Sequence, residues 1–461
     1  MRKVFFVLFV LLLVLPLTWF FINEFEGKPP EIKVDFPSVY LNNSYEISLV
    51  ASDKGMGLRR VAVSIAQKGK EEVLLEKEYP FSGYRGFFMG SKIYRDSFQI
   101  PVESWKYGMT DGEAVVKIEV SDYSWKDWNN GNRVVKKKRV IIDSSPPKIE
   151  VLSRRHNVER GGAGLVLYRL FEENLKSGVT VGDNFFPGYS GMFDDKDIYA
   201  SFFALSYTQG PGVEINVTAS DPAGNTSSRG FYYYIRDTKF RTDVLTISDR
   251  FLSRKMPEFD VGEKQPVFDA RQNPPLAKFI YINRVVRTQN IQDVLEPVVN
   301  TEPVRFWEGR FLRLPGSANR ASFADHRIYK YKGEEIDRQV HMGIDLASVA
   351  RAPVPAANSG RVLSTDRVGI FGNSVLIDHG FGLTTIYSHL STVLVKKGDR
   401  VEKGDIIGKS GSTGLAGGDH LHFGVAVNNV FVNPVEWWDL TWIKNNILSK
   451  IQYVEKLQFT Q

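Results

Sequence analysis

The sequence predicts a mainly β protein of several domains. We expect an N-terminal transmembrane helix, two β-sandwich domains, a partly helical linker and a C-terminal antiparallel β domain. Three observations predict this architecture. The chain of 461 residues is longer than one hydrophobic core usually serves, and its 39 Gly and 31 Phe indicate many strands and turns. Proline pairs lead into alternating strands at two places. A long uncharged apolar run stands at the start of the chain.

That run covers residues 4–22 and follows Met1-Arg2-Lys3. As a helix it is long enough to cross about 30 Å of hydrocarbon. No Ala-x-Ala cleavage site follows it, which favours an uncleaved signal anchor over residues 1–27 rather than a cleaved signal peptide. The basic residues before it predict a cytoplasmic N-terminus. We therefore expect a membrane-anchored protein of the cell envelope, with the bulk of the chain on the periplasmic or extracellular face.

The two sandwiches are predicted from a repeat. Pro29-Pro-Glu-Ile-Lys-Val34 recurs as Pro146-Pro-Lys-Ile-Glu-Val151. Alternating strands that end in Ser-Asp recur at residues 47–53, 116–122 and 213–221. Residues 28–145 and 146–237 are thus two β-sandwiches, which resemble the immunoglobulin-like modules of exported bacterial proteins, although no Cys or Trp signature supports the likeness. The resemblance leaves open whether they act as spacers or bind the cell wall.

The linker, residues 238–305, carries few strand signals. Helical spacing predicts helices over residues 245–259 and 275–298. The sequence leaves open whether this arm is a hinge, a lid or a partner-binding segment. A further helix is predicted for residues 441–461, with apolar side chains along one face that dock on the protein itself or contact a partner or membrane.

Charge and cysteine content limit the kinds of binding partner and metal ligand that are expected. Lys and Arg number 59 against 53 Asp and Glu, which gives a net charge of +6. A mildly basic protein can adhere to anionic wall polymers or lipid surfaces, although solubility alone accounts for this charge. No basic cluster with interleaved aromatics indicates a nucleic acid. The sequence has 0 Cys, so a metal site cannot use thiolate.

Histidines gather near the C-terminal end. Five of the 7 lie between positions 341 and 422, in His341-Met-Gly-Ile-Asp345, His379, Tyr387-Ser-His389-Leu and His420-Leu-His422. A catalytic zinc site needs three His or carboxylate ligands and one open position. In an extended strand, residues i and i+2 face one side, so the last two histidines would share a pocket. The alternative is a set of unrelated core and surface histidines.

Further short segments stand around these histidines in a fixed order. They are Ala352-Pro-Val-Pro-Ala356, Gly360-Arg-Val362, Gly372-Asn-Ser-Val-Leu-Ile-Asp-His-Gly380, Gly408-Lys-Ser-Gly-Ser-Thr-Gly414 and His420-Leu-His-Phe423. With the family pattern H-x-G-x-D-x-A at His341, residues 306–440 resemble the lysostaphin-like or LytM-type zinc endopeptidases. The resemblance implies a compact antiparallel β-fold with zinc in a groove, and hydrolysis of peptide bonds in peptidoglycan stem peptides or cross-bridges.

The resemblance also implies roles for single residues. His341, Asp345 and His422 correspond to the zinc ligands, whereas His389 and His420 correspond to the catalytic pair beside the metal. His379 matches a family position and is expected to serve in a turn or to support a ligand. No His-Glu-x-x-His helix is present, so the two catalytic imidazoles must handle the proton that Glu handles in those enzymes.

Three expectations remain open at this point. The alternative function is a non-catalytic wall-binding regulator or activator of another cell-wall hydrolase, but the complete ligand set favours the enzyme. Expected partners are peptidoglycan, the membrane through the N-terminal helix, and a protein regulator. Asp419 either raises the pKa of His420 or lies in an exposed loop, and His326 either reaches the groove or lies on the surface.

Overall fold

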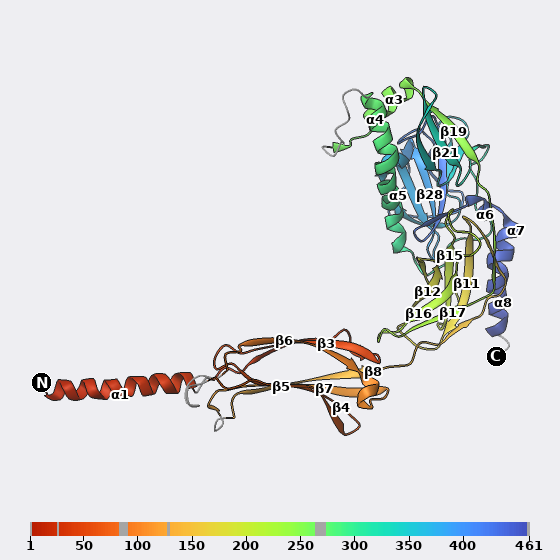
Figure 1. Cartoon of the computed structure of the whole chain (residues 1–461). Coiled ribbons are helices and arrows are strands. Elements are labelled where there is room, and N and C mark those ends of the chain that lie inside the picture. Colours follow the sequence, from red (N-terminus) through yellow and green to blue (C-terminus); the bar gives the residue numbers. More distant parts are fainter. Residues whose placement is uncertain (1, 25–26, 83–90, 127–129, 263–272, 459–461) are drawn as a thin grey trace. The chain divides into compact units, whose positions relative to one another are not determined.

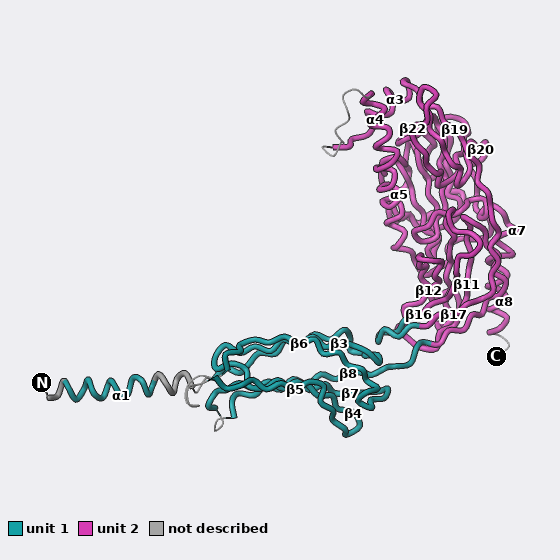
Figure 2. Tube along the Cα trace, viewed as in Figure 1, with its two compact units in different colours: residues 1–147, 220–226 teal, residues 148–219, 227–461 magenta. Residues whose placement is uncertain are grey.

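The computed structural model describes residues 2–24, 27–82, 91–126, 130–262 and 273–458 (Figure 1). Strands account for 44% and helices for 20% of it, so the prediction of a mainly β protein is confirmed. The chain divides into two compact units (Figure 2). We call residues 1–147 with 220–226 the first unit, and residues 148–219 with 227–461 the second unit.

Helix α1 (Arg2–Glu24) forms where the apolar run predicts a helix. Crossing a bilayer takes about 20 consecutive, predominantly apolar residues. Over the residues described, none of the helices is both long and apolar enough to do so. The transmembrane segment predicted for residues 1–27 is therefore not supported.

The first unit contains two sheets that share one core. One sheet has the order β1-β3-β6 and the other β2-β8-β7-β4-β5. In the inner strands β3 and β7 every second residue is buried, as in the run from Ala114 to Val120, and the buried side chains of both sheets form a single cluster. The elements are β1 (Glu31–Asp35), β2 (Tyr40–Leu41), β3 (Ser44–Ser52), β4 (Leu58–Gln67), β5 (Lys70–Glu78), β6 (Arg95–Glu103), η2 (Ser104–Tyr107), β7 (Gly112–Asp122) and β8 (Arg133–Ile142).

The aspartates of the recurring Ser-Asp signal fix the turns that follow their strands. Each carboxylate accepts a hydrogen bond from a backbone N–H further along the chain, which holds the turn closed. The pairs are Asp53 with Gly57 at 2.7 Å, Asp122 with Asn132 at 2.7 Å and Asp221 with Asn225 at 2.9 Å. The recurring Ser-Asp signal thus marks a turn of the same kind after each of these strands. The immunoglobulin-like character of the sandwiches stays a prediction.

The second unit begins with another pair of sheets, β14-β15-β11-β9 and β13-β12-β16-β17, and the parallel pair β10-β18. Their strands are β9 (Ile149–Val151), β10 (His156–Glu159), β11 (Ala163–Leu170), β12 (Lys176–Val181), β13 (Asn184–Pro187), β14 (Tyr189–Ser190), β15 (Ile198–Ala204), β16 (Ile215–Ser220), β17 (Thr226–Gly230) and β18 (Tyr233–Arg236).

The predicted linker is an integral part of the second unit. It contains β19 (Thr242–Ile247), α3 (Asp249–Lys255), η3 (Met256–Glu258), α4 (Pro274–Tyr281), the π-helix η5 (Ile282–Val286), α5 (Arg287–Leu295) and η6 (Glu296–Asn300). The helix predicted over residues 245–259 is wrong at its start. Residues 245–247 belong to β19, which pairs in parallel with β21 (His326–Tyr331), and the Ser248 side chain then caps α3.

The C-terminal β domain is built on a sheet with the order β20-β23-β32-β28-β27-β25-β30. Strand β26 pairs with β27, β33 pairs with β32, and β24-β31-β29 form a separate small sheet. The elements are β20 (Ala318–Ala321), β22 (Glu334–Val340), β23 (Ile344–Ala347), β24 (Pro353–Pro355), β25 (Gly360–Ser364), β26 (Arg367–Val368), η7 (Gly369–Phe371), β27 (Gly372–Asp378), β28 (Leu383–Leu390), β29 (Thr392–Val393), β30 (Arg400–Val401), β31 (Ile406–Lys409), β32 (Leu421–Val427) and β33 (Val430–Val432).

A helical segment ends the chain: α6 (Pro434–Trp438), α7 (Leu440–Ile443), η8 (Lys444–Leu448) and α8 (Ser449–Gln458). Its predicted apolar face is buried at Ile443, Ile447, Ile451 and Val454, whereas Leu440 is exposed. Both η8 and α8 pack on β11 of the second sandwich. One continuous core therefore joins this sandwich, the linker and the C-terminal β domain, so that the elements around the site form one body.

Candidate metal centre

Three neighbouring strands carry the predicted site residues to one place. Strand β23 pairs with β32 in a register that sets Asp345 opposite His422. Strand β28 pairs with the other edge of β32 and sets Ser388, the residue before His389, opposite His422. His341 follows β22 directly. Pairing between strands that are distant in the sequence thus gathers residues that lie about eighty positions apart in the chain.

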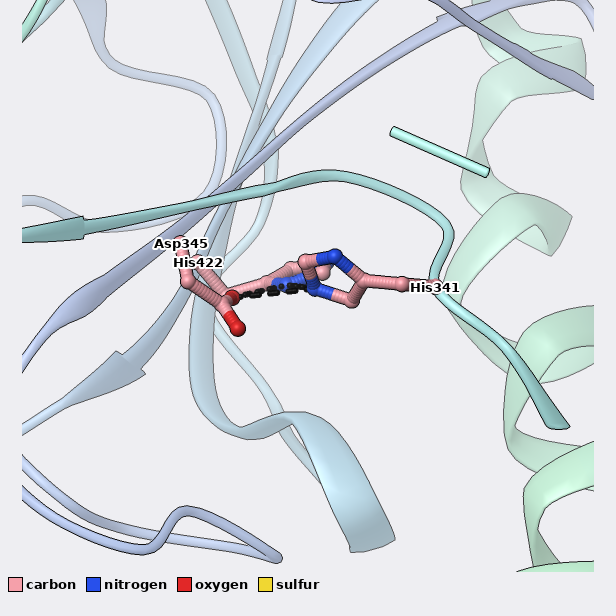
Figure 3. Close-up of side chains that lie close together, drawn as sticks. All are labelled: His341, Asp345 and His422. Carbon is pink, nitrogen blue, oxygen red and sulfur yellow. Dashed lines mark hydrogen bonds and ion pairs between the residues drawn. The ribbon is translucent and has the colours of Figure 1, made fainter. Parts of the chain in front are cut away.

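The three predicted ligands contact one another (Figure 3). His341 Nε2 lies 3.0 Å from Asp345 Oδ1 and 3.0 Å from His422 Nδ1, and the latter two atoms are also 3.0 Å apart. All three residues are buried. The sequence prediction placed these side chains in one coordination sphere, and the structure brings them together.

This triangle of donor atoms fits a zinc ion. His341 Nδ1 donates to the carbonyl oxygen of Ser322 at 3.0 Å, so Nε2 keeps its lone pair and points at the carboxylate and at His422. Three lone pairs that converge in a buried place repel one another unless a proton or a metal cation lies between them. Ligands at 2.0–2.1 Å from a tetrahedral zinc are about 3.3 Å apart, close to the spacing seen here.

Arg327, on β21, holds the carboxylate ligand in place. Its guanidinium donates to Asp345 Oδ2 at 2.8 Å, which leaves Oδ1 for the two histidines. Burial by itself raises the pKa of Asp345, but the charge and hydrogen bonds of His341 and the other histidines outweigh it and hold that pKa well below its usual value. The carboxylate is therefore ionised and oriented, as a metal ligand must be.

Gly343, inside the His-x-Gly-x-Asp motif, makes room for the third ligand. A Cβ at this position would lie 2.6 Å from both Cε1 and Nε2 of the His422 ring and 2.8 Å from the carbonyl oxygen of Phe423. The glycine is required because the imidazole lies directly against the backbone.

We expect Gly343→Ala to displace the His422 ring and to lower zinc affinity by about 10- to 100-fold, the usual cost of disturbing the groups that orient a metal ligand. A competition titration with a fluorescent zinc chelator measures this. Gly417→Ala is the matched control, because no atom lies within 4 Å of a Cβ built there. Equal zinc affinity for the Gly343 variant and the control would contradict the assignment of His422 as a ligand.

His389 and His420 lie beside the triangle with their rings 4.8 Å apart. His389 Nδ1 donates to the carbonyl oxygen of Thr413 at 2.8 Å, and His420 Nδ1 donates to that of Gly418 at 2.9 Å. In both rings, Nε2 therefore remains available to interact with a ligand in the groove. His420 Nε2 is 3.5 Å from Asp345 Oδ1, so His420 and His422 do face the same pocket, as the two-residue spacing predicts.

The electrostatic surroundings of these two histidines differ. Burial, followed by the charges of His420 and His422, lowers the pKa of His389 well below its ordinary value. Burial also opposes the charge on His420, but the hydrogen bond and charge of Asp345 outweigh it and raise that pKa. His389 has a positive φ of 64°, which costs a non-glycine residue about 1–3 kcal/mol and is typical of functional sites.

Three other predicted candidates lie away from the metal triangle. His379 is fully buried, with Nδ1 at 2.8 Å from the carbonyl oxygen of Ser359 and Nε2 at 2.7 Å from Thr385, so it supports the turn after β27. His326 is exposed on β21 and does not line the groove. Asp419 accepts hydrogen bonds from Ser410 and from the backbone of Arg351, and it is Asp345, not Asp419, that raises the pKa of His420.

The site opens into a groove of ≈ 480 Å³. One wall is the loop at residues 415–417, and the other comes from β19, α3 and the start of α5, in the linker that sequence could not assign. The wall residues Arg250, Arg254 and Arg287 and the supporting Arg327 are functional candidates that sequence reasoning missed. Their only sequence signal is a positive charge, which surface residues share.

Residues 339–434 match the family model described as Peptidase family M23. The match contains His341, Asp345, His389, His420 and His422, and its strands are those of the site. Residues 339–434 are therefore a peptidase family M23 domain, as the resemblance to lysostaphin-like and LytM-type enzymes predicted. Members of this family are zinc metallopeptidases, and the His-Asp-His group is suited to hold that ion.

Several known proteins are similar to this domain. The DD-carboxypeptidase/endopeptidase Mpg of Neisseria meningitidis serogroup B is 37% identical over 133 residues, which are 28% of this chain and 31% of the relative. The peptidoglycan DD-endopeptidase ShyA of Vibrio cholerae is 42% identical over 96 residues, 21% of this chain and 22% of the relative. The solved catalytic domain of lysostaphin from Staphylococcus simulans is 30% identical, with 28% of this chain and 98% of that chain covered and a TM-score of 0.25. The chain spans less than a third of the length of these two curated relatives.

Proposed function

We propose that this protein is a zinc-dependent endopeptidase that hydrolyses peptide bonds in peptidoglycan. The observation that carries the proposal is the triangle of His341, Asp345 and His422 donor atoms, which opens into a groove beside two further imidazoles. The family match supports the reaction class, and the names of the similar enzymes support the substrate. The site of action would be the cell envelope, where peptidoglycan lies.

The chain's own residues divide the work as follows. His341, Asp345 and His422 would hold the zinc ion, while Arg327 keeps the carboxylate oriented. When bound, zinc supplies a water molecule of lowered pKa and a Lewis acid for the scissile carbonyl. His389 Nε2, with its Nδ1 proton committed to Thr413, presents a lone pair that can orient a water molecule and accept its proton. His420 can donate a hydrogen bond to the oxygen on which negative charge develops.

A non-catalytic regulator of another cell-wall hydrolase is the alternative function. Such a protein has no need of a full set of ligands. Here three ligand side chains and both accessory histidines are present and gathered in one groove. This completeness favours the enzyme. A protein regulator remains part of the proposal, since the linker that lines the groove offers such a partner direct access to the site.

Purified cell wall tests the proposed function directly. The zinc-loaded full chain is incubated with peptidoglycan sacculi, and released fragments are separated by chromatography and identified by mass spectrometry. We expect new peptide termini that disappear after treatment with 1,10-phenanthroline and return with added zinc. Release that continues after verified zinc removal would contradict the proposal. Wall binding without any release by zinc-loaded protein would favour the regulator instead.

A further inference from the structure

One wall of the groove is rich in arginine. Arg250 and Arg254 come from α3, and Arg287 comes from the start of α5. We call these three residues the arginine wall. Among the described residues that line the groove, Asp345 is the sole carboxylate, and it is already engaged by Arg327 and the histidines. The positive charge of the wall therefore has no counter-charge inside the groove.

Arg287 shows the imbalance most clearly. Its Nε and Nη2 donate to the side-chain oxygen of Asn283 at 3.2 and 2.6 Å, and no carboxylate in the described part of the chain pairs with it. The nearby Asp337 is taken by Arg284 at 2.8 Å and by the amide of Asn283 at 2.7 Å. Burial lowers the pKa of Arg287, as expected for a cation that is removed from water without a partner. Such a guanidinium gains from an incoming anion.

Arg250 and Arg254 are one helical turn apart on α3 and so lie on the same face. Arg250 is exposed and pairs with no carboxylate within the residues that the structure describes. Helix α3 is fixed in place across the groove, because Arg254 donates to the carbonyl oxygen of Gly417 at 2.8 Å and the adjacent Lys255 donates to that of Ser412. The arginine wall is therefore a preorganised surface of the groove.

We propose that the arginine wall binds a free carboxylate of the substrate and thereby makes the site selective for anionic stem peptides over uncharged cross-bridges. The inference rests on the proposed endopeptidase function and names the substrate class for the same site. Guanidinium groups match carboxylates in geometry and form charge-assisted, often bidentate hydrogen bonds. A wall of three such groups beside the metal triangle would set both the position and the charge of the peptide segment bound there.

Two matched peptides test this inference. One is a synthetic cross-linked stem-peptide dimer with its free carboxylates, and the other is the same dimer with those groups converted to primary amides. The zinc-loaded full chain is expected to cleave the carboxylate form with a kcat/KM about 10- to 100-fold higher, the range for hydrogen bonds to charged groups. Equal kcat/KM values for the two forms would overturn the inference.

Variants separate the arginine wall from the metal as the source of any preference. Arg250→Gln combined with Arg287→Gln should lower kcat/KM for the carboxylate form and so reduce the preference to less than about threefold, with zinc content unchanged. Arg250→Gln alone keeps the test informative if the Arg287 change disturbs folding, because the Arg250 side chain is exposed and should account for part of the loss. Arg338→Gln, on an exposed arginine of β22 outside the groove, is the control and should change nothing. A preference that survives intact in the double variant would overturn the inference.

A binding measurement keeps this test separate from the proposed function. Calorimetry with zinc-loaded His389→Asn protein, whose turnover is expected to be strongly reduced, compares the affinities of the two peptides. Tighter binding of the carboxylate form that depends on the arginine wall supports the inference even when neither peptide is cleaved by the native chain, an outcome that would refute the endopeptidase alone. Equal affinities would refute the inference while leaving hydrolysis intact.

Discussion

His422→Ala is expected to remove zinc from the protein and to abolish hydrolysis. The ring supplies one of three donor atoms that lie 3.0 Å from one another. The two ligands that remain are one fewer than a catalytic zinc site needs. Turnover should fall by at least about 10⁴-fold, because without the ion the pKa of the water molecule is no longer lowered toward neutrality. Metal analysis of dialysed protein and fragment release from sacculi measure the two effects.

His326→Ala is the matched control for this change. It makes the same substitution in the same unit, but His326 is exposed and lies outside the groove. Zinc content and turnover should match those of the native chain. A His422 variant with native zinc content and activity would remove the ligand assignment.

Changes at His389 and His420 are expected to leave the metal bound and to reduce turnover by about 10²- to 10⁴-fold, the usual contribution of a positioned acid or base. Neither ring belongs to the triangle of donor atoms. His389→Asn is the better variant at the first position, since asparagine tolerates the positive φ found there and alanine does so less well. His420→Ala serves at the second, where no such strain exists.

Zinc content measured alongside turnover distinguishes this role from that of a ligand. If either variant loses zinc together with activity, that residue holds the metal and the division of roles is wrong. If both variants keep native turnover, the proton must be handled by another group, and the Nε2 atoms that face the groove have no catalytic part.

The gathering of the candidate ligands could be predicted because the signals for it are local and chemically specific. His341 and Asp345 are four residues apart, and His420 and His422 are two apart. The pairing of β23 with β32 then brings the two segments together. Histidine is also rare in this chain, so its concentration near the C-terminal end carries information. The glycine at 343 belongs to the same motif, but only the packed structure explains why it is needed.

The linker could not be predicted to the same degree, for a physical reason. Residues 245–247 show helical spacing, yet they form a strand because β21 lies about eighty residues further along and offers its edge. The positions of Arg250, Arg254 and Arg287 at the groove depend on how α3 and α5 pack on the C-terminal domain. Such tertiary contacts produce no periodic pattern in the sequence, so the arginine wall could be recognised only in the structure.

The most direct test of the account is to locate the metal itself. Crystals of the zinc-loaded protein, measured at and below the zinc absorption edge, should show one strong anomalous peak in the groove. We predict that this ion is bound by His341 Nε2, the Asp345 carboxylate and His422 Nδ1, with His389 and His420 outside its first coordination sphere. A peak at another place, or His341 and His422 too far apart to share the ion, would contradict the central claim.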